Sequence, residues 1–170
     1  MAFTSSSMFR SWTAAILGQG QTAAVLPAGY AGLGADTVNV ALFNNTGTPD
    51  KDATLATSGY NSAASQWVTA NEVTGSGIWA AGGRPLSGKT ITNPATGVTM
   101  FDATDLAGAG TGTLTNVYGC LVYDDTITAG TGGVADEGIC FNYFGGAQSV
   151  TSGTFTIVWN ANGIARITSS

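Results

Sequence analysis

The sequence predicts a mainly β protein, either an antiparallel β-sandwich or a jelly-roll-like barrel, with a short N-terminal helix. Three observations support this prediction. Apolar and polar residues alternate with period two in several segments, and turn-forming residues recur about every ten positions. The chain has 170 residues, of which only 9% are charged, and 25 are glycine. This composition is typical of β-structure with many turns, and the length suits one domain with a sizeable core.

The first 34 residues differ from the rest and are predicted to form an N-terminal helix and extended arm. Serines that offer a helix N-cap precede apolar residues spaced four apart, so we expect a helix over about residues 5–17. A Gly-rich connection then leads to a β-sandwich domain over residues 35–170. The apolar stripe of the helix consists of Met8, Trp12 and Ile16, with Phe9 beside it.

The β-domain contains a series of segments with strand character. In the first, DTVNVALF, Val38, Val40 and Leu42 share one face. Residues 55–67 fit either a short helix or an irregular crossing that buries Tyr60 and Trp67. Expected strands or extended pieces span residues 36–43, 70–92, 96–106, 116–123, 138–144, 153–160 and 163–168.

Residues 83–90 read GRPLSGKT, which satisfies the G-x-x-x-x-G-K-[ST] pattern of nucleotide-binding P-loops. A P-loop needs a helix that begins at the lysine, because the helix N-terminus helps hold the phosphates. Here Lys89 is followed by the β-branched run Thr90, Ile91 and Thr92 and soon by Pro94. The sequence therefore favours a strand and a turn, and we expect no nucleotide to bind.

Composition excludes several other classes. The chain has no histidine, which removes the commonest general base and metal ligand, and two cysteines do not make a zinc site. Its five cations are dispersed and its net charge is −5, so no basic patch for nucleic acid is expected. The sequence contains no run of about 20 apolar residues, so it predicts no membrane-spanning segment. We expect no catalytic residue, no cofactor and no metal.

Two acidic pairs flank one loop, Asp124-Asp125 before it and Asp136-Glu137 after it. Paired carboxylates at such a place occur in Ca²⁺ sites and in glycosidases. The spacing of an EF-hand is absent, and the loop between the pairs is neutral and Gly-rich. Solvated turn carboxylates are the favoured interpretation.

Cys120 and Cys140 lie in the two predicted strands that flank the same loop. If residues 118–123 and 138–144 form an antiparallel hairpin centred near Gly130, the two cysteines come close to facing each other. A cross-strand disulfide and two buried thiols are both compatible with that arrangement, because the sequence leaves the register open. Cytosolic synthesis favours thiols.

The four tryptophans fit either the core or a sugar-stacking platform, and the core is the favoured interpretation for aromatics in a β-rich chain. Trp159 lies in the apolar run TIVW and is the strongest core candidate. Trp12 is the one expected to face a partner, because an amphipathic helix at a terminus must bury its apolar stripe against something.

The order of several segments resembles a family of small virion proteins encoded among the head and tail genes of tailed bacteriophages. The resemblance runs through DTVNVALF, ANEVTGSGIWAAGGRPLSGKTIT, MFDATDL, LVYDD and GTFTIVWNANGIARIT, and it covers roughly residues 36–168. The closest phrases are the Gly-Gly that follows an aromatic residue, the Tyr-Asp-Asp, and the closing Phe-Thr-Ile-x-Trp. The N-terminus and the Gly-rich insert at residues 107–113 depart from the pattern, and no active-site residue is carried over.

The resemblance implies a non-enzymatic structural protein, most simply a decoration (cement) protein of the capsid exterior, made in the host bacterial cytoplasm. Its implied partners are the major capsid protein and copies of itself. In this interpretation the N-terminal segment grips neighbours through Met8, Phe9, Trp12 and Ile16. The alternative is a tail or receptor-binding component with a carbohydrate-binding β-module, which predicts exposed Trp or Tyr in a groove. A nucleotide hydrolase is the third hypothesis, and it predicts Mg²⁺-ATP binding through Lys89.

Overall fold

The computed structural model describes residues 3–16, 32–62, 64–127 and 135–169. The described chain is mainly β, with antiparallel sheets and two short helices, so the predicted fold class is confirmed. None of its helices is long and apolar enough to cross a membrane. The elements are β1 Ser7–Met8, α1 Arg10–Ile16, β2 Val38–Phe43, α2 Leu55–Ser58, β3 Arg84–Pro85, β4 Thr90–Ala95, β5 Val98–Asp102, β6 Leu106–Ala107, β7 Gly112–Asp124, β8 Glu137–Gly153, β9 Thr156–Ile157 and β10 Ala165–Thr168.

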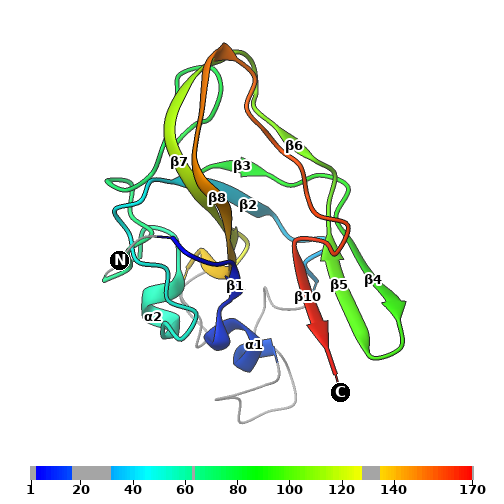
Figure 1. The fold of residues 1–170 in the computed structure, drawn as a ribbon. Coiled ribbons are helices and arrows are strands. Elements are labelled where there is room, and N and C mark those ends of the chain that lie inside the picture. Colours follow the sequence, from blue (N-terminus) through cyan, green and yellow to red (C-terminus); the bar gives the residue numbers. More distant parts are fainter. Residues whose placement is uncertain (1–2, 17–31, 63, 128–134, 170) are drawn as a thin grey trace.

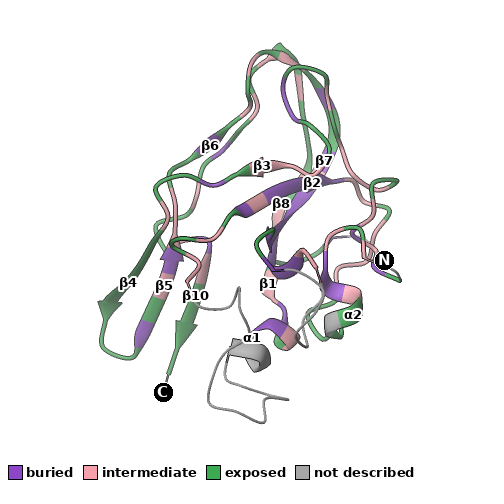
Figure 2. Ribbon diagram, turned by 180° about the vertical axis from the view of Figure 1, so that it is seen from behind, coloured by how far each residue is buried: buried purple, intermediate pink, exposed green. Residues whose placement is uncertain are grey.

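In the described residues the strands form three sheets. The largest has the order β1-β8-β7-β2-β3, the second β10-β5-β4, and the third pairs β6 with β9. Figure 1 shows β7 and β8 as a long curved hairpin, with the β10-β5-β4 sheet on the flank opposite α2. Figure 2 places the buried residues mainly along β2, β7 and β8. The core therefore follows the centre of the five-stranded sheet.

Strand β2 is buried on both faces. Val38, Val40 and Leu42 point to one side as expected, and all three are inaccessible to solvent. Ala41 and Phe43, on the other side, are buried as well. The strand thus lies between two layers, which explains its almost continuous apolar sequence.

The hairpin of β7 and β8 confirms both predicted strands and extends them well beyond the expected bounds. Its register pairs Cys120 with Asn142 and Val122 with Cys140. The next pair is Tyr123 with Gly138, so the ladder shifts by one residue at a bulge. The register therefore differs from one centred on Gly130, a residue outside the described part of the chain.

Residues 153–160 form less strand than their β-branched sequence predicts, since β9 has only two residues. The chain after β9 turns toward the loop before β6. There Trp159 donates its backbone N–H to Asp105 Oδ1 at 3.0 Å and its ring Nε1–H to the carbonyl of Thr104 at 3.2 Å. Trp159 is only partly buried, and Val158 beside it is 72% exposed. The prediction of Trp159 as a core residue was therefore wrong.

The N-terminal segment is an integral part of the β-domain. Ser7 and Met8 form β1 on the edge of β8, and Phe9 continues this pairing through a backbone hydrogen bond to Ile139. The helix therefore starts at Arg10, later than expected. Instead of capping a helix, the side chain of Ser6 accepts a hydrogen bond from the backbone of Tyr143.

The segment also contributes aromatic rings to the core. Phe9 is fully buried and packs against Trp67 and Phe141, with centroids 6.1 and 5.4 Å away. Trp12 and Phe3 are likewise buried. Phe9 and Trp12, two of the residues expected to grip a neighbour, thus pack inside their own chain, which corrects the partner-facing role of Trp12. The described residues 3–13 belong to the packed domain and do not form a free arm.

Trp67 is the centre of this aromatic core. It is 2% exposed and lies within 6.1 Å, centroid to centroid, of four phenylalanine rings. Residues 55–67 contain the short helix α2 followed by an irregular crossing, so both expected features are present. Tyr60 is half-buried rather than buried. The rings around Trp67 are Phe3, Phe9, Phe43 and Phe141.

Candidate functional site

The GRPLSGKT string forms a strand, a turn and a second strand. Its Arg and Pro make up β3, its buried Leu86 bonds through its backbone to Val38, and β4 begins at Thr90. The predicted strand is confirmed, and Lys89 precedes it in the turn instead of starting a helix. The string therefore lacks the helix N-terminus that a phosphate-binding loop requires.

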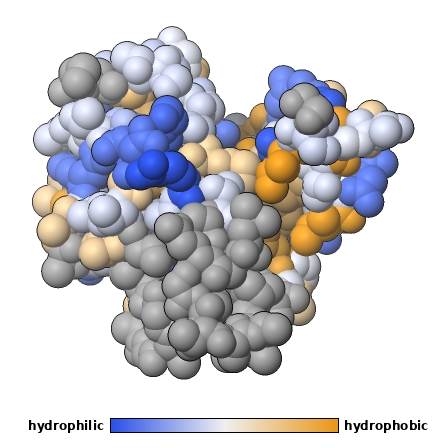
Figure 3. All heavy atoms as spheres, turned by 90° about the horizontal axis from the view of Figure 1, so that it is seen from below, coloured by the Kyte–Doolittle hydropathy of each residue, from blue (hydrophilic) through white to orange (hydrophobic). Residues whose placement is uncertain are grey.

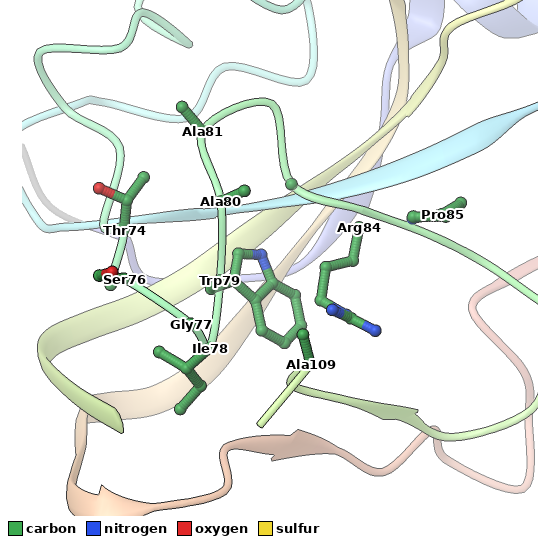
Figure 4. Close-up of a pocket in the computed structure, with 12 residues that line it drawn as sticks. Thr74, Ser76, Gly77, Ile78, Trp79, Ala80, Ala81, Arg84, Pro85 and Ala109 are labelled. Atoms are coloured by element: carbon green, nitrogen blue, oxygen red, sulfur yellow. The ribbon is translucent and has the colours of Figure 1, made fainter. Parts of the chain in front are cut away.

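A cavity of about 460 Å³ lies beside the start of this string, between the loop of residues 74–83, strand β3 and Ala109. Figure 4 shows the ring of Trp79 and the side chain of Arg84 next to each other along this cavity. The loop folds back on itself because Gly75 and Trp79 exchange backbone hydrogen bonds of 2.9 and 3.0 Å. A Cβ at Gly75 would meet Ile78 and Leu114, so the turn needs glycine there.

Arg84 supplies the charge of this site. Its guanidinium carbon lies 6.0 Å from the centroid of the Trp79 ring, a cation–π distance. The ring is itself fixed, because Trp79 is buried and donates its Nε1–H to the carbonyl of Val40 at 3.2 Å. The side chain of Arg84 is therefore held along the wall of the cavity.

No acidic group of the described chain neutralises Arg84. Among the described residues the ion pairs join Arg10 and Lys51 to Asp52, and no carboxylate oxygen lies within 4.0 Å of Arg84. Its Nε–H is buried and has no hydrogen-bond partner in that part of the chain. From the sequence alone, Arg84 is one of five dispersed cations. Nothing in its local sequence distinguishes it, because the cavity arises from tertiary packing.

A hydrogen-bonded network holds the loop in place. Glu72 accepts hydrogen bonds from the hydroxyl of Tyr60 at 2.8 Å and from the backbone of Gly82 at 2.9 Å. Tyr123 donates its hydroxyl to the carbonyl of Gly82 at 2.6 Å, and its ring stacks on that of Tyr60 with centroids 4.9 Å apart. Burial raises the pKa of Glu72, although these hydrogen bonds favour its charged form. The loop is thus anchored to the central sheet through Gly82.

The two predicted acidic pairs meet at the end of the β7–β8 hairpin where the loop connects the two strands. Asp124 and Glu137 are register partners and are buried, which corrects the interpretation that they are solvated turn residues. Burial, together with the nearby carboxyl of Asp36, raises the pKa of Asp124 to about 6. Burial and a hydrogen bond with Asp125 raise that of Asp136 to about 6, and burial raises that of Glu137 to about 8. Among the described residues, no three ligating side chains are grouped to hold a metal ion.

Cys120 and Cys140 are free, buried thiols on adjacent strands. They occupy diagonal positions of the ladder, because Cys120 lies opposite Asn142 and Cys140 opposite Val122. Diagonal neighbours are about 7–8 Å apart, beyond the usual span of a disulfide. Burial raises the pKa of both thiols, that of Cys140 to about 12. Of the two alternatives from the sequence, the structure has the thiols.

Apolar side chains line a second, smaller cavity of about 160 Å³ between the N-terminal segment and the three-stranded sheet. Ile91 and Ile167 belong to it and remain 54% and 44% exposed. Met8 lines the cavity from the opposite side, together with Trp12, whereas the side chain of Ile16 lies outside the described part of the chain. Figure 3 shows hydrophobic side chains gathered on this sheet, beside the hollow of the lower surface.

The tryptophans do not present a sugar-stacking surface in this fold. Trp12, Trp67 and Trp79 are at most 6% exposed, and Trp159 is partly buried with its ring N–H bonded. Comparisons of the chain with protein-family models, with curated proteins and with solved structures gave no significant match. Function must therefore be argued from the sequence and from the geometry of this molecule.

Proposed function

We propose that this protein is a non-enzymatic structural component of a phage particle that docks on the outside of the capsid and stabilises it. The observation that carries the proposal is the apolar face of the three-stranded sheet, on which Ile91 and Ile167 are exposed and Phe101 between them is buried. Ala165, Phe101 and Ile91 lie in one row across β10, β5 and β4, and Ile167 lies in the next row. Exposed aliphatic side chains that share one face are typical of a protein–protein contact.

The occupant that we assign to this face is the major capsid protein, on the basis of the sequence resemblance to virion proteins. A decoration protein has many equivalent sites on a shell, so each contact can be modest and still reinforce the lattice through avidity. Low charge also suits this role, because few charged groups must be desolvated when the surfaces meet. The N-terminal segment takes part as the opposite wall of the apolar cavity rather than as a free arm.

The proposal is tested by locating the protein and then by weakening the face. Antibody labelling of purified virions of the source phage, imaged by electron microscopy, is expected to mark the heads. The double variant Ile91→Asp/Ile167→Asp is expected to lower the occupancy of undecorated capsids at least about tenfold, because two charges are then buried against the shell.

The matched control is Thr92→Asp/Thr168→Asp, which adds the same charges to exposed positions on the other face of the same sheet, opposite Met100 and Val98. It is expected to bind capsids like the unmodified protein. Label confined to the tail or its tip would replace the capsid assignment with the alternative of a tail or receptor-binding component. Equal binding by both double variants would show that this face is not the contact.

A further inference from the structure

We propose that the cavity beside Arg84 is a binding site for a compact organic carboxylate, with the guanidinium as its charged contact. The proposal does not depend on the capsid role, since it rests on a different part of the surface. The site lies between the loop of residues 74–83 and β3, whereas the apolar face lies on β4, β5 and β10.

The first argument is an unpaired charge. Of the three arginines, Arg10 pairs with Asp52, and Arg166 donates to the side-chain oxygen of Asn162. Arg84 has neither kind of partner among the described residues, and its terminal nitrogens, unlike its buried Nε, are not among the buried polar atoms. A carboxylate that binds end-on to the two terminal nitrogens of Arg84 would give this guanidinium the charged partner that the described chain does not supply.

The second argument is the shape and chemistry of the lining. The cavity has a volume of about 460 Å³, which lies within the range of small-molecule sites. Gly77, Ala80 and Ala81 leave its walls unobstructed, and Ser76 adds a hydroxyl. Arg84 is the charged residue of this lining. The preferred ligand therefore has one negative charge and a small, largely uncharged body.

The third argument is preorganisation. Arg84 is held on Trp79, and Trp79 is bonded to β2. The loop is tied down through Gly82 to Glu72 and Tyr123. A guanidinium that is already fixed loses little rotamer freedom on binding, which favours its use as a recognition group.

The same geometry disfavours a nucleotide, even though the site adjoins the GRPLSGKT string. Lys89 is not among the residues that line the cavity. A single guanidinium on a chain of net charge −5 does not balance the several charges of a polyphosphate. The anion contact therefore belongs to the arginine of the string and not to its Gly-Lys pair.

The test is a titration of the full chain followed through the Nε–H signals of its three arginines in ¹⁵N NMR spectra. One probe is methyl β-D-glucuronate, with methyl β-D-glucoside as its uncharged match. The other is N-acetyl-L-alanine, with N-acetyl-L-alaninamide as its match. We expect a saturable shift of the Arg84 signal with at least one of the two acids and with neither uncharged analogue.

The two acids distinguish the source of the carboxylate. Binding of the glucuronate alone indicates an acidic sugar, and binding of the acylated amino acid alone indicates a peptide chain end. Either result, or both, supports the proposal. The proposal is overturned if neither acid shifts Arg84, if Arg10 and Arg166 respond as strongly, or if inorganic phosphate binds as tightly as the acids.

Variants provide an independent readout. Arg84→Gln should weaken binding of the acid at least about tenfold, and Arg84→Lys should recover only part of it because lysine lacks the planar fork. Arg166→Gln removes an exposed guanidinium and should leave the affinity unchanged. Unchanged affinity in Arg84→Gln would contradict the assignment. If that variant does not fold, the titration of the unmodified chain still decides the question.

Discussion

At the scale of single residues, glycines allow strands and loops to approach closely around the Arg84 cavity. Gly83 has a φ of +80°, and a Cβ there would overlap the backbone of Val40. Gly77, in the same loop, has a φ of +78° but no atom within 4 Å of an added Cβ. The two positions share a positive φ and differ in the space around them.

This pair yields a prediction about stability. Gly77→Ala should cost about 1 kcal/mol of the free energy of unfolding, because a side chain in left-handed backbone is strained. Gly83→Ala should cost at least twice as much, because β3 must also move away from β2. Urea unfolding of both variants measures the difference. Equal losses would show that the contact between Gly83 and Val40 relaxes without cost.

At the scale of elements, β1 ties the N-terminal segment to the hairpin. The strand is short, but it precedes Phe9, which fills the space between Trp67 and Phe141. A two-residue strand contributes few hydrogen bonds. The attachment of β1 to β8 therefore depends mainly on the buried rings of Phe3 before it and Phe9 after it. The N-terminal segment therefore helps to stabilise the fold of its own chain.

Phe9→Ala is expected to lower the free energy of unfolding by about 3–5 kcal/mol, as for other buried phenylalanines. Ser5→Ala, at an exposed position two residues before β1, should change it by less than about 0.5 kcal/mol. Thermal and urea unfolding of both variants test this expectation. If Phe9→Ala were as stable as the unmodified chain, the N-terminal segment would be a detachable arm as the sequence suggested.

At the scale of the whole molecule, the buried carboxyl groups of Asp124 and Glu137, at the loop end of the β7–β8 hairpin, make the stability of the fold depend on pH. The pKa values of Asp124 and Glu137 in the folded chain, about 6 and about 8, lie above their ordinary values of 3.8 and 4.5. The folded state therefore binds protons more tightly than the unfolded state. Stability from these groups is fully present below about pH 4 and is lost as pH rises through the folded pKa values.

We predict that the unfolding temperature falls as pH rises from 5 to 8, the opposite of the usual acid sensitivity of carboxylates. Asp124→Asn, which is uncharged throughout, should make this dependence less steep and stabilise the chain at pH 8 by on the order of 2 kcal/mol, while Glu137 continues to contribute. Asp52→Asn is the control, because its exposed ion pairs lower the pKa of Asp52 and so leave this pH range unaffected. A rise in stability between pH 5 and 8 would contradict the assignment of these shifts.

The sequence by itself determined the fold class, most of the strands and the failure of GRPLSGKT as a P-loop. These features depend on local properties, such as the alternation in residues 36–43 and the β-branched residues after Gly88, which act wherever the segment lies. The sequence also predicted that the strands containing Cys120 and Cys140 pair as an antiparallel hairpin, but it did not predict their register. A bulge at Ile139 changes the pairing without a distinct signal in the sequence.

Only the tertiary structure decided which of these residues are buried. Trp12 is buried because β1 attaches the first helix to β8, whereas Trp159, which bonds to a loop 54 residues away, is only partly buried at the edge of the core. The burial of Asp124 and the cavity at Arg84 arise in the same way, from segments distant in the chain that meet in space. Burial depends on these long-range contacts, and no property of a single segment encodes them.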